Sequence, residues 1–506
     1  MKHTNTFLAI FFPLTILVGL AVAGAYLFFF AASPETLIAS MRQPGRDAIP
    51  QKSAAEMARK ALVVQGAIRN VESASEPNDS EGFWLWFRGL DLTNQSPPSD
   101  PASLDWAPEG GVATKLPQKN WPAKLEQLWQ IEVGEGHAGA AVYGGAIYLL
   151  DHDEEKNLDL MRKLDLATGT EIWRNSYPVK ITPSHGITRA VCAIIPKKLL
   201  DDTYDQPIVV SFGPLGQVVA WNTKTGKALW TLDLVAKYGT KIPSWYSAQC
   251  PYFDPITKQL VLAPSGEKVS LVALNVVTGE VLWEAPNPRD WQMSHTSITP
   301  AVIDDQRLYL YSTCDGVMAV DAKTGEYLFD TTEWQMGTAA AASPVDVGDG
   351  RFFFCGGYGS RSTPSATMLR FTKKEGKFHV EKLFTLSDRI FGSDQQTPIF
   401  YKNHLFGNKK KGQYFVCLDL EGNEVWSSKP EKIGIGGAYT LVDDLILALG
   451  DTGELWVMRA TPEKFERIAQ YELLGGDAQA TWGPIAIVGK KMIFRDLTRM
   501  ACIQLP

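Results

Sequence analysis

The sequence predicts an all-β fold: an eight-bladed β-propeller of four-stranded antiparallel blades, preceded by one N-terminal transmembrane helix. Three observations carry this prediction: a recurring glycine and aromatic motif, a composition rich in tryptophan and glycine, and a long uncharged segment near the N-terminus. The 506 residues include 15 Trp and 43 Gly, and 45% of the residues are hydrophobic. Many tryptophans together with many glycines are typical of β-rich proteins with periodic aromatics and tight turns. Such an apolar chain is not a disordered one.

The N-terminal residues form the first predicted element, a membrane-spanning helix. Residues 7–32 contain no charged side chain, and a helix of that length exceeds the hydrocarbon core of about 30 Å. We therefore expect a short cytoplasmic N-terminus over 1–6 and a transmembrane signal anchor over 7–32, with a cleaved signal peptide as the alternative. Either interpretation exports the rest of the chain. The anchor predicts a single-pass protein of the inner (cytoplasmic) membrane, with its main domain in the periplasm.

Two segments separate the anchor from the repeats. Residues 33–82 show no strand pattern and are interpreted as a spacer, in which 53–71 has the loose apolar periodicity of a short helix. Residues 83–125 form a lead-in segment, which is rich in tryptophan and proline. We expect this lead-in segment to pack on the main domain.

A repeat begins at about residue 126 and defines the fold. Each copy has Asp or Asn, then Thr-Gly or a glycine alone, and then an aromatic residue at a nearly fixed distance. The copies lie at 165–173, 222–230, 275–283, 321–329 and, one residue shorter, 419–426. Glycine supplies the positive φ of a tight turn, and the Asp or Asn side chain bonds the backbone of that turn. Because two more strand-like runs precede each turn, each unit predicts the four strands of one propeller blade.

The blade count follows from the residues that end the units. They are Trp129, Trp173, Trp230, Trp283, Phe329, Phe384 and Trp426, with a degenerate unit that ends near Ile468. Residues 126–133 supply a last strand without three strands before it, whereas 482–505 supply three strands without a last one. Pairing of 126–133 with the C-terminal strands closes the ring and leaves no open edge, which predicts eight blades over 126–506. The chain has no Trp-Asp dipeptide, and this disfavours a WD-type propeller.

Charge and cysteine usage exclude several classes of function. The net charge of −7 disfavours a nucleic-acid partner, because binding to phosphates needs a basic surface. The six cysteines contain no C-x-x-C pair, which argues against zinc, thioredoxin-type and c-type haem sites. We expect buried thiols, with one or two disulfides as the alternative. The acidic run 151–155 is interpreted as a solvated loop, with a calcium site as the alternative.

The D/N-x-x-T-G-x-x-x-W repeat resembles that of PQQ-like (quinoprotein-like) β-propellers, and the resemblance extends over about three quarters of the chain. The family includes dehydrogenases that hold PQQ and calcium on the propeller axis, and cofactor-free propellers that bind proteins. The dehydrogenases resemble one another in a pair of adjacent cysteines, which this sequence lacks. The resemblance therefore implies the non-enzymatic bacterial envelope subgroup: a protein-binding scaffold with envelope proteins as partners and no cofactor. A PQQ- and calcium-dependent oxidoreductase and a ligand sensor are the alternatives.

A candidate binding site lies where the blades begin, because the segment before each first strand should line the propeller axis. Three of the seven histidines occupy one repeat position in these segments. The predicted axial pocket consists of His137, His185, Trp245, His295, Asp394 and Trp482. An organic ligand, a peptide tip and a metal ion are the candidate occupants, and hydrogen bonding between neighbouring blades is the structural alternative for the histidines. No residue is predicted to be catalytic.

Overall fold

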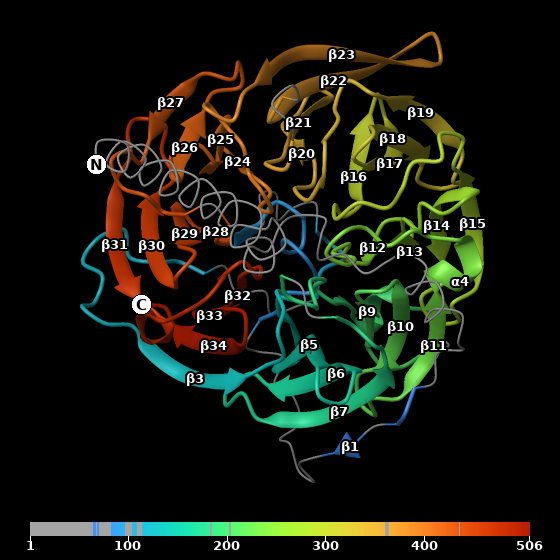
Figure 1. Cartoon of the computed structure of the whole chain (residues 1–506), viewed down its shortest axis with the longest axis horizontal. Helices are drawn as coiled ribbons and strands as arrows, with labels where there is room; N and C mark the ends of the chain where they lie inside the picture. Colours follow the sequence, from blue (N-terminus) through green and yellow to red (C-terminus); the bar gives the residue numbers. More distant parts are fainter. Residues whose placement is uncertain are drawn as a thin grey trace, which may run out of the picture. The chain divides into compact units, whose positions relative to one another are not determined.

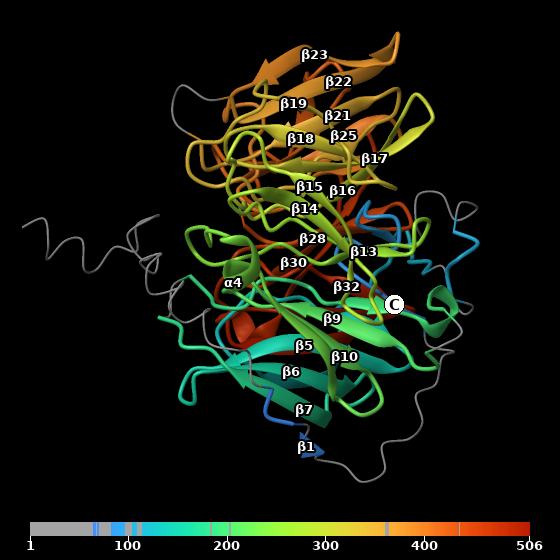
Figure 2. The ribbon, with the colours of Figure 1, turned by 90° about the vertical axis from the view of Figure 1, so that its right-hand side faces the viewer.

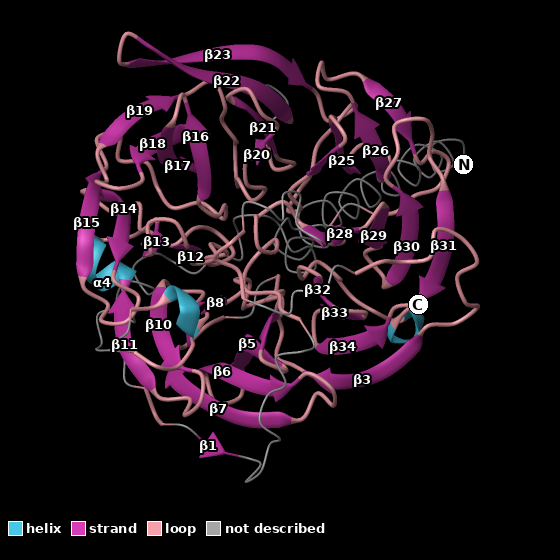
Figure 3. Cartoon of the chain, turned by 180° about the vertical axis from the view of Figure 1, so that it is seen from behind, coloured by secondary structure: helices cyan, strands magenta, loops and turns pink. Residues whose placement is uncertain are grey.

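The structure, a computed structural model, describes residues 64–66, 68–69, 82–96, 104–108, 114–182, 185–201, 204–359, 364–434 and 436–506. These residues form eight β-sheets that stand around a central axis (Figure 1), and the predicted all-β, eight-bladed propeller is thereby confirmed. Strands dominate the described residues (Figure 3). Their helices are short: α4 (Leu234–Tyr238) and two 3-10 turns at Lys197–Leu199 and Leu474–Gly476.

Blades 1 to 4 follow one another along the chain, and each blade runs from its innermost to its outermost strand. Their strands are, in blade 1, β4 (Ala141–Tyr143), β5 (Ala146–Asp153), β6 (Leu158–Asp165) and β7 (Glu171–Pro178); in blade 2, β8 (Ala193–Ile195), β9 (Ile208–Phe212), β10 (Gln217–Asn222) and β11 (Ala228–Asp233); in blade 3, β12 (Tyr252–Asp254), β13 (Gln259–Leu262), β14 (Val269–Leu274) and β15 (Val281–Pro286); and in blade 4, β16 (Thr299–Ile303), β17 (Gln306–Ser312), β18 (Val317–Asp321) and β19 (Tyr327–Thr331).

Blades 5 to 8 continue the same antiparallel order. Their strands are, in blade 5, β20 (Val345–Asp346), β21 (Arg351–Cys355), β22 (Ala366–Lys374) and β23 (Lys377–Leu386); in blade 6, β24 (Ile399–Tyr401), β25 (His404–Lys409), β26 (Tyr414–Leu418) and β27 (Glu424–Ser427); in blade 7, β28 (Tyr439–Val442), β29 (Leu445–Leu449), β30 (Glu454–Arg459) and β31 (Arg467–Glu472); and in blade 8, β32 (Ala486–Val488), β33 (Lys491–Arg495), β34 (Arg499–Gln504) and β3 (Glu126–Glu132). In the side view of Figure 2, blades 1 to 5 follow one another from β7 near the bottom to β23 at the top.

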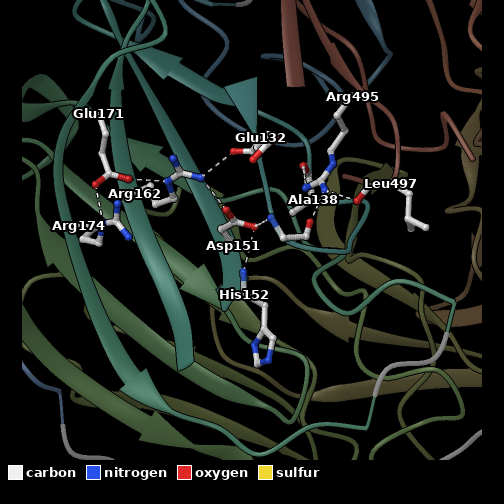
Figure 4. Close-up of polar contacts among 10 residues, drawn as sticks. Glu132, Ala138, Asp151, His152, Arg162, Glu171, Arg174, Arg495 and Leu497 are labelled. Atoms are coloured by element: carbon white, nitrogen blue, oxygen red, sulfur yellow. Dashed lines mark hydrogen bonds and ion pairs between the residues drawn. The ribbon is translucent and has the colours of Figure 1, made fainter. Parts of the chain in front are cut away.

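Blade 8 closes the ring, because β3 from the start of the propeller pairs antiparallel with β34 at its end. A buried cation strengthens this junction. Arg495, with no exposed surface, donates from Nη2 to the carbonyl of Gly134 at 2.8 Å and from Nη1 to that of Ala138 at 3.4 Å. The amide of Gly134 in turn donates to Asp151, whose carboxylate pairs with Arg162 at 2.7 Å (Figure 4). Side chains of blades 1 and 8 thus fix the segment that joins the two blades.

The glycine and the tryptophan of the repeat motif form the contact between neighbouring blades. Gly279, in the turn between β14 and β15 of blade 3, has φ of +74°, and a Cβ added there would lie 2.7 Å from Cγ of Trp230. Trp230, on the last strand of blade 2, also donates its indole N–H to the carbonyl of Val276 at 2.9 Å. Trp129 contacts Gly169 and bonds the carbonyl of Leu166 in the same way. Each such tryptophan therefore packs on the glycine turn of the next blade.

The segments before the propeller add two short strands to its sheets. β1 (Ile68–Arg69) pairs with the outer edge of β7, and β2 (Gln95–Ser96) runs parallel to β28. The helix predicted over 53–71 therefore does not reach residues 68–69, because their backbone pairs with a strand edge; its earlier residues lie outside the described ones, except 64–66, which are not helical.

The predicted membrane anchor over 7–32 also lies outside the described residues. None of the helices in the described part of the chain has the length and the apolar character needed to cross a membrane.

Candidate functional site

A cavity of about 100 Å³ lies among the segments that precede the innermost strands, and we call it the axial pocket. Four of the six residues predicted for it line it: His137, Trp245, His295 and Trp482. The other lining residues are Phe87, Arg189, Ala248, Cys250, Ser297, Ala339, Ala341, Tyr358, Gln395, Gln396 and Pro484. Most of these side chains are aromatic or small and apolar, so the pocket suits a flat ligand rather than a hydrated ion.

Five of the predicted residues lie in succession around the axis, from the segment before blade 8 to the segment before blade 4, and we call them the ring arc. Trp482 stacks on His137, with ring centroids 5.1 Å apart. Nε2 of His137 reaches the backbone carbonyl of His185 at 2.9 Å. The ring of Trp245 lies 6.0 Å from that of His185 and also 6.0 Å from that of His295. Ring contacts therefore join Trp482 to His137, and His185 through Trp245 to His295, while the hydrogen bond from His137 to the backbone of His185 links the two sets.

The two histidines that line the pocket have defined protonation states. A carbonyl can only accept, so Nε2 of His137 carries the proton that it shares with the carbonyl of His185; likewise Nε2 of His295 donates to the carbonyl of Ser244 at 2.7 Å. Burial, reinforced by the charge of Arg189, holds the pKa of His137 well below its ordinary value and lowers the pKa of His295 to about 4. Both rings are therefore neutral at pH 7, with Nδ1 as a bare acceptor.

Arg189 is the cationic side chain of the pocket lining. Its Nη2 donates to the carbonyls of His185 and Gly186 at 2.6 and 2.9 Å, and Glu135 accepts from the amide of Gly186 at 3.0 Å. Burial lowers the pKa of Arg189 to about 10, so the guanidinium stays charged at pH 7. Arg189 is not among the residues predicted for the pocket, because it lies four residues beyond the repeat position of His185 and no arginine stands at the corresponding place in the other blades.

Asp394 does not line the pocket but supports one wall of it. Its carboxylate pairs with Lys410 at 2.8 Å, and Nζ of Lys410 lies 5.2 Å from the ring centre of Tyr358. Tyr358 lines the pocket and contacts Trp245 with ring centroids 5.3 Å apart. Burial raises the pKa of Asp394 above its ordinary value. Tyr358 was not predicted, since it follows the second strand of blade 5 rather than preceding the first.

The lead-in segment lies against innermost strands of the propeller. Trp84 bridges to Val142 in the middle of β4, and β2 pairs with β28. Between these two attachments, Phe87 lines the axial pocket. The segment thus contributes a side chain to the wall of the pocket.

The backbone at the pocket adopts conformations that side chains rarely allow. Trp245 and Tyr246 have φ of +65° and +71°, and His185 has φ of +49°. Successive left-handed residues without glycine cost free energy, and such strain clusters at binding sites. The segment 185–189 and the segment 244–246 are therefore held in place by the contacts of the ring arc.

The acidic run 151–155 is a solvated turn only at Glu154 and Glu155, and its first residues differ from that prediction. Asp151 and His152 are buried in β5, and His152 Nδ1 lies 2.7 Å from a carboxylate oxygen of the buried Asp159. Figure 4 shows Asp151 turned toward Arg162, which also pairs with Glu171. These partners lie on neighbouring strands, so an inspection of the run alone does not reveal them. In the described residues, no group of three or more His, Cys, Asp or Glu side chains has the arrangement of a metal site.

All six cysteines are free thiols in the structure, and five of them are buried. Cys250 lines the axial pocket, and burial raises its pKa to about 11. A thiol with so high a pKa is a poor nucleophile at neutral pH. The chemistry of the pocket is therefore that of hydrogen bonding and stacking, with two neutral imidazoles, an indole N–H and one guanidinium.

Comparisons with known proteins place the chain among related propellers. Residues 156–428 match the family described as outer membrane protein assembly factor BamB. No curated protein matches the sequence significantly. Among solved structures, BamB from Moraxella catarrhalis is 12% identical with a TM-score of 0.49, covering 75% of this chain and 100% of that one. The quinohemoprotein alcohol dehydrogenase from Comamonas testosteroni is 10% identical with a TM-score of 0.53, covering 90% of this chain and 84% of that one. The latter similarity shows the fold alone.

The fold raises the question of whether the axial pocket suits PQQ and calcium. PQQ is a flat molecule with three carboxylates, and protein-bound calcium takes six to eight oxygen ligands. The lining has one cationic side chain, Arg189, and no carboxylate. Metal-ligand clusters of three or more acidic, His or Cys side chains are likewise absent from the described residues. The residues of the pocket therefore do not fit PQQ with calcium.

Proposed function

The chain belongs to the family of the outer membrane protein assembly factor BamB, and from this premise we propose that it is a protein-binding scaffold of the bacterial cell envelope. The observation that carries the proposal is the family match over 156–428, which runs from blade 1 to blade 6. The name of the family indicates a role in the assembly of outer membrane proteins. The axial pocket agrees with a binding protein, because the buried thiol of Cys250 is not an activated nucleophile and His295, with its pKa lowered to about 4, is a weak base.

The rim of blade 3 is a surface that suits a protein partner. On its outermost strand, β15, Val281 is 37% exposed and Leu282 is 49% exposed. The outer edge of β7 is covered by β1, but within the described residues no strand covers that of β15. An open strand edge with exposed apolar side chains binds an extended segment of another protein through backbone hydrogen bonds.

The proposal is tested by deletion of the gene in the bacterium that encodes it, followed by complementation. We expect the deletion to lower the amount of folded outer membrane proteins, and the wild-type gene to restore it. A photoreactive residue at position 282 should crosslink to one envelope protein, whereas one at position 425, equally apolar and 41% exposed on β27, serves as the matched control. Unchanged outer membrane proteins together with no crosslinked protein at either position would refute the proposal.

We also propose that residues 7–32 tether the propeller to the inner membrane, with the propeller in the periplasm. The support is the sequence of this segment, which has no charged residue. After cell fractionation, the chain should remain in the inner membrane through an alkaline wash. A protease should reach the propeller once the outer membrane is opened. Release by the wash would refute the anchor, and protection of the propeller in spheroplasts would refute its orientation.

The competing function, a PQQ- and calcium-dependent oxidoreductase, makes a different prediction for the purified chain. Addition of PQQ and calcium would then produce alcohol-dependent reduction of a dye. We expect no such reduction, because the pocket lining does not match the charges of the cofactor. Dye reduction above that of free PQQ would favour the oxidoreductase.

A further inference from the structure

Three side chains in the wall of the axial pocket are more than nine-tenths buried and carry a polar atom that has no hydrogen-bond partner among the described residues. These atoms are Nδ1 of His137, Nε1 of Trp245 and Nδ1 of His295. The three side chains are 5%, 7% and 8% exposed, and all three line the pocket. Oε1 of Gln395, on a less buried side chain of the same lining, is a further atom of this kind. Buried polar groups in proteins are nearly always paired, because an unpaired one loses its bonds to water and gains none in return. An exception that occurs three times in one pocket points to a ligand.

The hydrogen-bond roles of these atoms are fixed by their surroundings. Nε2 of each histidine donates to a backbone carbonyl of a neighbouring blade, so Nδ1 of His137 and Nδ1 of His295 are both acceptors. The indole N–H of Trp245 can only donate. A ligand that matches these three atoms therefore offers two N–H or O–H groups as donors and one oxygen or nitrogen as acceptor. The amide of Gln395 can turn to present either its oxygen or its N–H, so it is compatible with either role in the ligand.

The charge and shape of the pocket restrict the class of ligand further. The guanidinium of Arg189 in the lining repels a cationic ligand, while a carboxylate would bring lone pairs against both Nδ1 acceptors. The wall formed by Trp245, Tyr358 and Trp482 favours a planar group that stacks on aromatic rings. The volume of about 100 Å³ admits a small group rather than a large molecule.

We propose that the axial pocket binds a primary carboxamide. This uncharged planar group carries two N–H donors for the acceptors of His137 and His295, and one carbonyl oxygen for the indole N–H of Trp245. A free small amide and the Asn or Gln side chain of a docked protein share this chemistry. The inference is independent of the proposed scaffold function, since it concerns the pocket and not the rim.

The test uses the full-length chain, labelled with ¹⁵N at its seven histidines, and benzamide as the probe. Calorimetry measures the affinity, and the ¹⁵N spectrum reports the Nδ1 atoms directly. We expect benzamide to bind and to shift the Nδ1 signals of two histidines. Acetophenone lacks the N–H donors and benzoate is an anion of the same shape, so both should bind about tenfold more weakly, as expected for the loss of a buried hydrogen bond. Equal or tighter binding of either control overturns the proposal.

The two sources of the carboxamide are separated with the peptides Gly-Gln-Gly and Gly-Glu-Gly. Binding of the Gln peptide but not of benzamide identifies a side chain of a partner, and binding of benzamide but not of the peptide identifies a free amide. Either result, with the shift of Nδ1, supports the proposal. Failure of both probes to bind, or binding that leaves every Nδ1 signal unchanged, overturns it.

The contribution of the indole N–H is tested with Trp245→Phe, which should weaken the binding of the carboxamide about tenfold. The matched control is Trp426→Phe, which removes an indole N–H that bonds the carbonyl of Thr461 far from the pocket, on the last strand of blade 6. This control should bind as the wild type does. Unchanged affinity in a folded Trp245→Phe variant overturns the role of Trp245, and if that variant does not fold, the comparison of benzamide with acetophenone on the wild type decides.

Discussion

Acid should destabilise the propeller through His295, and the size of the effect follows from its burial. The pKa of this ring is lowered from 6.5 to about 4 in the folded chain. Above pH 6.5 the ring is neutral in both states and contributes nothing. As the pH falls below 6.5, the unfolded chain binds a proton that the folded chain does not bind until about pH 4, so stability decreases over this window. The slope is about 1.4 kcal/mol per pH unit, which gives roughly 2 kcal/mol between pH 7 and pH 5.

The assay compares wild type with His295→Gln, because Gln does not titrate and its amide can still donate to the carbonyl of Ser244. Urea unfolding is followed by tryptophan fluorescence at pH 7 and at pH 5 for both proteins. We expect the wild type to lose roughly 2 kcal/mol more than the variant. His379→Gln, at an exposed position on β23, serves as the control and should behave as the wild type. An equal loss in wild type and His295→Gln would show that His295 does not resist protonation and would refute the reasoning.

Three substitutions test the packing of the blades, each through the urea midpoint of the purified variant. Gly279→Ala should cost about 2–3 kcal/mol, since its φ is positive and the new methyl group meets Trp230 at 2.7 Å; an unchanged midpoint would contradict the inter-blade contact. Arg495→Met should cost about 3 kcal/mol or more, because buried carbonyls lose their donor; a stabilised variant would argue against the closing role of this residue. Asp254→Asn should cost about 3 kcal/mol of stability, because Arg307, which lies 2.8 Å from the carboxylate, loses its counter-charge. A variant as stable as the wild type would show that this ion pair does not stabilise the fold.

The ring of blades was predictable from the sequence because its information is local and repeated. Each turn needs a glycine with positive φ, and each last strand presents an aromatic residue to the next turn, so Trp230 and Gly279 recur at matching offsets in other blades. A contact that is repeated around a ring leaves a period in the sequence. The eight-bladed fold follows from that period and from the strand left over at each end.

The axial pocket was predictable only in the part that shares the period. Aligning the segments before the first strands identified the residues of the ring arc. Arg189, Tyr358 and Phe87 were missed because they come from a position beyond the repeat, from a later turn of blade 5 and from the lead-in segment. Asp394 holds the repeat position but turns to Lys410. Residues that come together only when the ring of blades closes do not recur at a fixed spacing in the sequence, so no sequence pattern predicts their contact.

The pairing of β3 with β34 also sets the order in which the molecule can be completed. Residues 126–132 are made before all other strands of the eight blades, but their strand partner ends at Gln504, so blade 8 cannot form until β34 has emerged. Before that moment the nascent protein is an open arc with one incomplete blade and two uncovered sheet edges. Strand edges of this kind associate with other chains. Synthesis of this protein therefore includes a long interval in which these sheet edges are open to other chains, and the emergence of β34 ends that interval.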